Sequence, residues 1–134
     1  QLATADFLAD QEAMHAYLDT FRGEIQNRLN CIYKTFKGME SDGLPVTAIP
    51  PQGAIYLSVR CNLMGKTLPD GTTISTNEQI RQYLLMDARV AVVPFRAFGL
   101  EGETGWFRMS IGAVSQEALE AAMARLESSI RRLT

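Results

Sequence analysis

The sequence has few of the residues that build metal sites or disulfide frameworks. It contains two cysteines, Cys31 and Cys61, and one histidine, His15, among 134 residues. No CxxC pair and no His/Cys ligand spacing is present, so the sequence predicts no metal site. Two isolated cysteines do not form a disulfide framework, and we therefore expect a reducing, cytoplasmic environment.

The sequence also lacks a large excess of positive or negative charge, and it lacks long apolar runs. Lys and Arg number 13 and Asp and Glu 15, which gives a formal net charge of -2. The sequence offers no basic stripe for a nucleic-acid backbone and no run of about 18 apolar residues for a membrane span. We therefore expect neither nucleic acid nor membrane as a partner. The composition, 46% hydrophobic and 21% charged, is that of an ordinary globular domain.

Hydrophobic periodicity predicts three main helices, over residues 10–37, over residues 75–86 and from residue 115 onward. Asp10 is the expected N-cap of the long first helix, and Gly38 is its expected stop. Ser75 with Glu78 three residues later is typical of a capping box that opens the middle helix. The first few residues resemble the end of an earlier helix or its linker.

Four short segments with strand-like patterns are separated by turns, at residues 46–49, 54–59, 90–93 and 106–111. The third is a continuous apolar run, which predicts a strand buried on both faces. Together with the helices, they predict an α+β fold. Its small, mainly antiparallel sheet of three to four strands packs on the long N-terminal helix, the middle helix and the C-terminal helix.

The last of these segments carries a charged residue at its centre. Alternation places Phe107, Met109 and Ile111 on the core face, and Trp106, Arg108 and Ser110 on the other face. An arginine between an aromatic and a small hydroxyl side chain suits a planar, bidentate contact with a carboxylate. On spacing alone, a solvent-exposed, solubilising arginine is the more common alternative.

Three stretches together resemble the C-terminal, small domain of class I/II aminotransferases, the fold-type-I enzymes that use pyridoxal phosphate. Residues 51–57, PQGAIYL, are similar to the PxGAFYL strand of that family. Residues 84–99 resemble its segment from a Leu-Leu pair through VavvPGsaFG, and residues 106–111, WFRMSI, resemble its yfRlsf strand. The order and spacing agree over almost the whole chain.

The resemblance implies roles for particular residues. The arginine that matches Arg108 binds the α-carboxylate of the amino-acid substrate in that family, and Gly53 matches a glycine whose backbone lies near the substrate. For Gly53, a turn that only glycine tolerates is an equal alternative. Four further residues are candidates for lining the cleft: Ile55, Tyr56, Arg96 and Trp106. Arg96 stands where many relatives carry a small residue, so it either contacts a substrate carboxylate or points to solvent.

The family also requires a lysine that binds pyridoxal phosphate, and this chain has no lysine in the matching S-x-x-K context. Its lysines are Lys34, Lys37 and Lys66. We therefore expect no catalytic residue in this chain, no cofactor bound to it alone and no transaminase activity of the isolated chain. The resemblance implies that residues 10–134 are the small domain, and residues 1–9 the remnant of a preceding element. A large cofactor-binding domain of the same polypeptide and a homodimer of the full-length enzyme are the implied partners.

Other functions remain open at this point. Lyases and synthases of the same fold keep the carboxylate-binding arginine, and some transcription regulators carry an aminotransferase-like sensor domain. A non-enzymatic α+β ligand-binding module would show the same order of elements. The amino acid used as substrate is not specified by the sequence.

Overall fold

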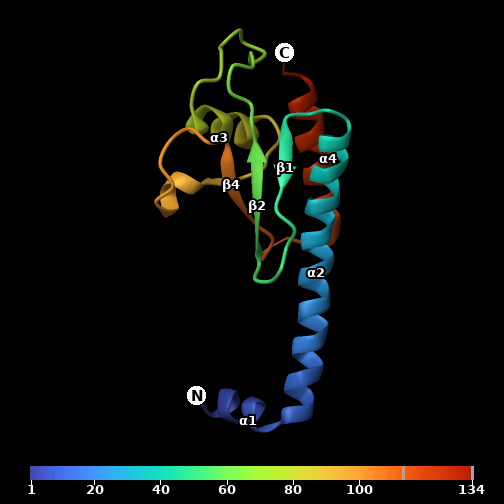
Figure 1. Ribbon diagram of the computed structural model, residues 1–134. Coiled ribbons are helices and arrows are strands. Elements are labelled where there is room, and N and C mark those ends of the chain that lie inside the picture. The colour runs from blue at the N-terminus through green and yellow to red at the C-terminus, as the bar shows by residue number, and fades with distance from the viewer. Residues whose placement is uncertain (113, 134) are drawn as a thin grey trace.

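The computed structural model describes residues 1–112 and 114–133. Its helices are α1 (Leu2–Ala9), α2 (Gln11–Ser41), α3 (Asn77–Met86) and α4 (Gln116–Arg131), with a short 3₁₀ helix η1 (Phe95–Phe98). Its strands are β1 (Val46–Ala48), β2 (Tyr56–Cys61), β3 (Val93–Pro94) and β4 (Trp106–Ser110). The predicted α+β class and the predicted order of elements are confirmed (Figure 1).

The four strands form one antiparallel sheet in the order β1-β2-β4-β3. β2 and β4 lie at its centre, and their register pairs Leu57 with Met109 and Ser58 with Arg108. On the other side of β4, Val93 of the edge strand β3 also pairs with Arg108. The arginine therefore lies in the middle of the sheet, with a neighbouring strand on each side.

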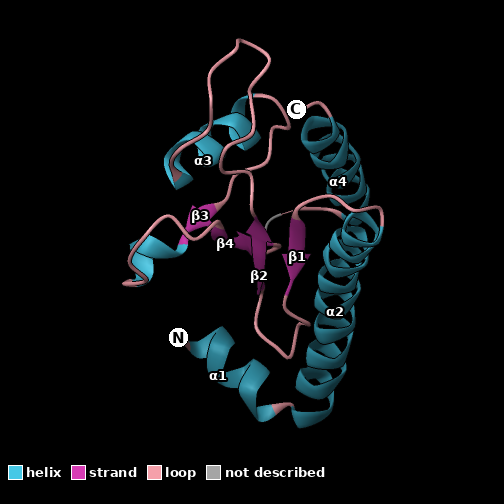
Figure 2. Ribbon diagram, turned by 45° about the horizontal axis from the view of Figure 1, so that its top comes forward, coloured by secondary structure: helices cyan, strands magenta, loops and turns pink. Residues whose placement is uncertain are grey.

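The long helices pack against one face of this sheet, and Figure 2 shows α2 and α4 side by side along it. The strand residues that face the helices are buried: Leu57, Val59, Phe107 and Met109. The helices contribute stripes at spacings of three and four, Leu29, Ile32 and Phe36 from α2 and Leu119, Met123, Leu126 and Ile130 from α4. These residues belong to one buried cluster, so the core lies on this face of the sheet. Burial of each such side chain contributes about 1.5–3 kcal/mol to the free energy of unfolding.

The N-terminal part of α2 extends beyond the sheet, and α1 lies at its far end (Figure 1). Three aromatic side chains line this extension. Phe7 meets Tyr17 edge to face at 5.9 Å, and Tyr17 stacks on Phe21 at 6.1 Å. All three remain exposed, together with Leu2 and Leu8. We call Phe7, Tyr17 and Phe21 the aromatic row.

Of the two predicted boundaries of α2, the N-cap holds and the stop is wrong. Asp10 caps α2, because its Oδ1 accepts a hydrogen bond of 3.0 Å from the Ala13 amide. Gly38 does not stop the helix, which continues to Ser41. The buried stripe extends past Gly38 to Met39, so packing overrides the glycine's low helix propensity. The turn falls instead at Gly43, whose φ of +81° supplies the left-handed conformation.

The capping box of α3 lies one residue later than predicted. Thr76 is the N-cap: its Oγ1 accepts from the Gln79 amide at 3.2 Å, and Gln79 Oε1 accepts from the Thr76 amide at 3.1 Å. Glu78 instead pairs with Arg81. Ser75–Glu78 and Thr76–Gln79 both fit the sequence pattern of a capping box, and only the second pair forms it.

The predicted strand at residues 90–93 is also wrong in extent and in burial. Only Val93 and Pro94 pair with a neighbour. Val90 and Val92 are buried, whereas Ala91 and Val93 are exposed. The reason is that β3 is an edge strand of a sheet with helices on one face, so its other face stays uncovered.

No helix among the described residues combines the length and the apolar composition needed to cross a membrane.

Candidate functional site

The sheet face away from the helices carries the predicted arginine. β4 places Trp106, Arg108 and Ser110 on this face, and β2 adds Tyr56 and Ser58. None of these side chains belongs to the core, and Arg108 itself is half-buried. The alternation predicted for residues 106–111 is therefore confirmed, and Arg108 is neither in the core nor fully exposed.

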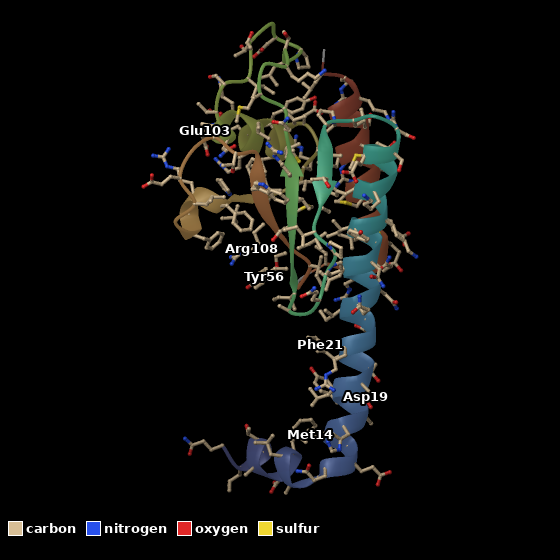
Figure 3. All side chains as sticks on the ribbon, viewed as in Figure 1. Met14, Asp19, Phe21, Tyr56, Glu103 and Arg108 are labelled. Atoms are coloured by element: carbon tan, nitrogen blue, oxygen red, sulfur yellow. The ribbon has the colours of Figure 1, made fainter. Side chains whose placement is uncertain are left out.

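Two aromatic rings hold the guanidinium of Arg108. Its Cζ lies 4.2 Å from the ring centroid of Tyr56 and 4.1 Å from that of Phe98. Tyr56 comes from β2 and Phe98 from η1, which follows β3, so the rings reach β4 from its two opposite sides. Both distances lie within the cation–π range of about 6 Å. Figure 3 shows the side chains of Arg108 and Tyr56 next to each other, beside the central strands β4 and β2.

No acidic side chain pairs with this arginine in the described part of the chain. The ion pairs of residues 1–112 and 114–133 involve other arginines and Lys37. With a ring near each side, the N–H donors of a guanidinium are left at its edge. The arrangement can therefore bind a planar oxyanion, such as a carboxylate, in a bidentate manner.

The loop that follows η1 is anchored to the start of α3. Asn77 is 4% exposed, and its Oδ1 accepts from the Gly105 amide at 2.9 Å while its Nδ2 donates to the Gly102 carbonyl at 3.3 Å. The Asn77 amide donates in turn to the Glu103 carboxylate. These contacts fix both the first turn of α3 and the entry into β4.

Gly105 fits closely at this entry. Its φ is +73°, and a Cβ at this position would lie 2.8 Å from the carbonyl oxygen of Cys61. The Gly105 carbonyl accepts from the Cys61 amide at 2.9 Å, which joins the loop to the end of β2. Only glycine combines this conformation with this close approach.

Two other predicted residues lie away from Arg108. Gly53 and Ile55 line a groove of about 430 Å³ between the β1–β2 connection and Phe21 and Leu29 of α2. Ile55 packs against the core. The φ of Gly53 is not in the left-handed region, where Ala54 lies instead at +60°, so the turn-glycine interpretation of Gly53 is wrong.

The other two candidates, Arg96 and Trp106, lie at the two ends of the segment that joins β3 to β4. Arg96 is on η1 with its side chain 75% exposed, and its Nη1 lies 3.9 Å from Glu103 Oε1. Trp106 is half-buried at the start of β4, opposite Arg60. The side chain of Arg60 already has a hydrogen-bond partner, because its Nε donates to the Thr104 carbonyl at 3.0 Å. The structure thus brings Arg108 together with Tyr56, and leaves Arg96 at the rim.

The residues near this face include no activated nucleophile. Complete burial of the Cys61 thiol raises its pKa to about 12, so the thiol stays protonated at neutral pH. Within the described residues, no group of three or more His, Cys, Asp or Glu side chains gathers where a metal ion could bind. The charge that this face offers to a ligand is the guanidinium of Arg108.

Comparison with known proteins identifies the family. The profile described as "Aminotransferase class I and II" matches residues 1–126. The chain belongs to this family. An aspartate aminotransferase of Pyrococcus abyssi is 35% identical over 131 residues, which cover 98% of this chain and 29% of that enzyme. A probable aspartate/prephenate aminotransferase of Rickettsia conorii is 47% identical over 81 residues, 60% of this chain and 19% of that enzyme.

Solved aminotransferase structures share the fold. The aspartate aminotransferase of Rhizobium meliloti superposes with a TM-score of 0.75 at 32% identity, over 88% of this chain and 28% of that chain. An aromatic aminotransferase of Pyrococcus horikoshii gives a TM-score of 0.71 at 31% identity, over 96% and 30%. The chain thus spans less than a third of the length of these aminotransferases.

Sequence reasoning missed two residues that shape this part of the aminotransferase fold. Phe98 belongs to the stretch that resembles the family, but its contact with Arg108 is made across the sheet and has no local signal. Asn77 is an ordinary residue for the first turn of a helix, and its hydrogen-bond partners lie 25 to 28 residues later in the sequence. The Gly-rich loop at residues 99–105 was the available signal that a close approach occurs here.

Proposed function

We propose that this chain is the small domain of a pyridoxal-phosphate-dependent aminotransferase that transfers an amino group between an amino acid and a 2-oxo acid. Residues 10–134 form this domain, and residues 1–9 belong to a preceding element. In this proposal Arg108 binds the α-carboxylate of the substrate. The observation that carries the proposal is the guanidinium of Arg108, which lies on the open sheet face between two rings without an acidic partner among the described residues.

The charge balance at this position supports a ligand. A half-buried cation without a counter-ion loses part of its hydration and gains no ion pair in return. A substrate carboxylate supplies the missing partner, and two charge-assisted hydrogen bonds contribute about 3–5 kcal/mol together. Cation–π contact with Tyr56 and Phe98 supports the charge but leaves the hydrogen-bond donors of Arg108 free.

Pyridoxal phosphate is the cofactor that family membership implies, and the residues of this chain alone do not fit it. The cofactor supplies an electron sink when it is bound through a lysine. Here Lys37 pairs with Glu40, and Lys34 lines a polar groove between α2 and α4. Lys66 lies in the loop after β2, away from Arg108. We therefore infer that another part of the polypeptide supplies this lysine, and that the isolated chain is inactive.

A large domain of the same polypeptide is the partner that we propose for the extended part of α2. The aromatic row and its neighbours Leu2 and Leu8 form an exposed apolar surface. Surfaces of this kind are normally covered by another domain. In Figure 3, Phe21 and Met14 lie on this extension, and Arg108 and Tyr56 lie on the sheet above it. A domain seated there would cover the aromatic row and also close the site over Arg108.

The substrate remains a proposal drawn from relatives. Relatives are named for aspartate, for prephenate and for aromatic amino acids. Every amino acid carries an α-carboxylate, so the role of Arg108 is independent of this choice. Gly53 remains a candidate for substrate binding, and Ile55, Tyr56, Arg96 and Trp106 for lining the cleft. Arg96 is also a candidate for contact with a second carboxylate. We further propose a homodimer of the full-length protein and a cytoplasmic location.

The test is an Arg108→Ala variant of the full-length enzyme, measured with L-aspartate and L-phenylalanine as amino donors. Loss of about 3–5 kcal/mol lowers kcat/KM by at least about 10²-fold for each substrate that the wild type uses. Arg81→Ala is the matched control, because Arg81 is an exposed arginine paired with Glu78 on α3. An unchanged kcat/KM in Arg108→Ala would show that the carboxylate assignment is wrong.

A further inference from the structure

The two rings at Arg108 differ in how they are held. Tyr56 is part of β2, and backbone pairing with Ser110 of β4 fixes its position. Phe98 is on η1, outside the sheet, and 48% of it is exposed. Nothing in the sheet register therefore requires Phe98 to contact the guanidinium, yet its centroid is the nearer of the two, at 4.1 Å.

Local contacts hold η1 in place on both sides of Phe98. The Phe95 ring meets the Phe98 ring edge to face at 6.0 Å. Gly99 follows with a φ of +92°, and its amide and that of Leu100 donate to carbonyls of η1. The chain thus turns back directly after Phe98, which directs the following loop toward α3.

The far end of this loop is held by Asn77. The hydrogen bonds from Asn77 to Gly102 and from Gly105 to Asn77, together with the contact to Glu103, attach the loop to α3. The loop is therefore fixed at η1 by Phe95 and Gly99, and at its C-terminal end by Asn77. These contacts join the loop to the fold at both ends, and the Phe98 ring lies against the guanidinium between them.

The position of the rings decides how a ligand can approach. If either ring moved away, the guanidinium could rotate about its side-chain torsions, and a carboxylate would have to restrict that motion on binding. With Tyr56 and Phe98 in contact, the plane of the guanidinium is already restricted. This restriction lowers the entropy lost when the two parallel hydrogen bonds form.

We propose that Phe98 is a positioning residue: held by the loop anchored at Asn77, its ring restrains the guanidinium of Arg108 against Tyr56 so that the edge of the guanidinium receives the substrate carboxylate. This inference rests on the proposed function of Arg108 and extends it to a residue that makes no hydrogen bond with the substrate. Phe98 acts on the substrate through Arg108 alone.

The test compares variants of the full-length enzyme with L-aspartate and L-phenylalanine as probes. Phe98→Leu removes the ring and keeps an apolar side chain, and Phe98→Tyr restores a ring. Leu100→Ala is the matched control, because Leu100 is an apolar residue of the same loop with similar exposure, 42%, and has no ring to place against the guanidinium. Since Phe98 is half exposed, its replacement leaves the core intact, and Phe98→Met serves if the leucine variant does not fold.

We expect Phe98→Leu to raise KM about three- to tenfold with a smaller change in kcat, since a restrained cation–π contact is lost. Phe98→Tyr should restore the wild-type KM, and Leu100→Ala should change KM less than twofold. A second readout does not depend on activity. In the ¹⁵N spectrum of arginine side chains, the Nε–H signal of Arg108, assigned with Arg108→Lys, should move downfield in Phe98→Leu and not in Phe98→Tyr.

The outcomes separate this inference from the proposed function. If Arg108→Ala raises KM and Phe98→Leu leaves both KM and the Arg108 signal unchanged, Phe98 is not a positioning residue and the carboxylate role of Arg108 stands. If Leu100→Ala matches Phe98→Leu, the effect is general to this loop and the inference is wrong. If Arg108→Ala itself has no effect on KM, the proposed function fails first.

Discussion

A Gly105→Ala substitution tests whether the entry into β4 is as closely fitted as the structure indicates. Gly105 lies directly before β4, two contacts join it to β2 and α3, and its φ is +73°. An added Cβ would meet the carbonyl oxygen of Cys61 at 2.8 Å and its carbonyl carbon at 3.3 Å. These atoms are backbone, so they cannot rotate away as the end of a flexible side chain could.

Three effects determine the stability of this variant: two destabilise it and one partly offsets them. An L-residue in the left-handed region costs about 1–2 kcal/mol, and replacing glycine recovers about 0.4–1 kcal/mol through the less flexible unfolded chain. The steric overlap then forces the end of β2 away from the loop, at about 1–3 kcal/mol for an overpacked site. The net expectation is a loss of about 2–4 kcal/mol in the free energy of unfolding.

The matched control is Gly102→Ala in the same loop. Gly102 has a similar φ of +86°, but a Cβ there would meet no atom within 4 Å. It therefore carries the conformational cost without the overlap, and we expect it to lose about 1 kcal/mol or less. The difference between the two variants measures the close approach at Gly105 by itself.

Urea unfolding of the two variants and the wild type, followed by circular dichroism, gives the free energies. If Gly105→Ala lost no more stability than Gly102→Ala, the close contact between the loop and β2 would not exist in solution. The same variant should also disturb Arg108, because displacement of the loop shifts the start of β4. Its KM for amino donors in the full-length enzyme should rise, while that of Gly102→Ala should stay near the wild type.

Two further predictions concern the start of α3 and the cysteines. Thr76→Ala should lower the free energy of unfolding by about 1 kcal/mol, and Ser75→Ala by less, because Thr76 is the N-cap; equal losses in urea unfolding would contradict the assigned cap. At pH 8, a maleimide should label the half-exposed Cys31 and not Cys61 in the folded protein, since burial raises the pKa of Cys61 to about 12 and also blocks access. Both should react in denaturant, and mass spectrometry that finds Cys61 labelled under native conditions would refute its burial.

The parts of this fold that could be predicted from sequence are those with a local cause. Alternation in residues 106–111 placed Arg108 on the face away from the core. The period of α2 identified its buried stripe from Ile25 to Phe36, whereas Phe21 nearer its N-terminus is exposed. Asp10 was recognised as an N-cap because its hydrogen bond is to a residue three positions later. Each of these features depends on neighbours within one or two turns of the chain.

The errors have a distant cause. Gly38 satisfied the local rule for a helix stop, but Met39 packs into a core whose other members come from elsewhere in the chain. Ser75 and Thr76 both fit the local capping pattern, and the contacts of Asn77, the first residue of α3, with Glu103 and Gly102 have no local signal. The two-sided burial expected for residues 90–93 required a central strand, and strand order is not encoded in four residues.

The same difference between local and distant contacts explains why the sequence predicted the position of Arg108 but not its contacts. An arginine in a strand is ambiguous, because the local pattern is identical for a solvated side chain and for a ligand-binding one. The structure resolves part of this ambiguity, since two rings enclose the guanidinium while no described carboxylate neutralises it. A surface arginine kept only for solubility has no need of a ring contact from a loop that is tied to α3 by Asn77. η1, the loop and Asn77 together hold a ring against this one cation. We therefore infer that the cation meets a ligand in a fixed orientation, as the proposed function requires.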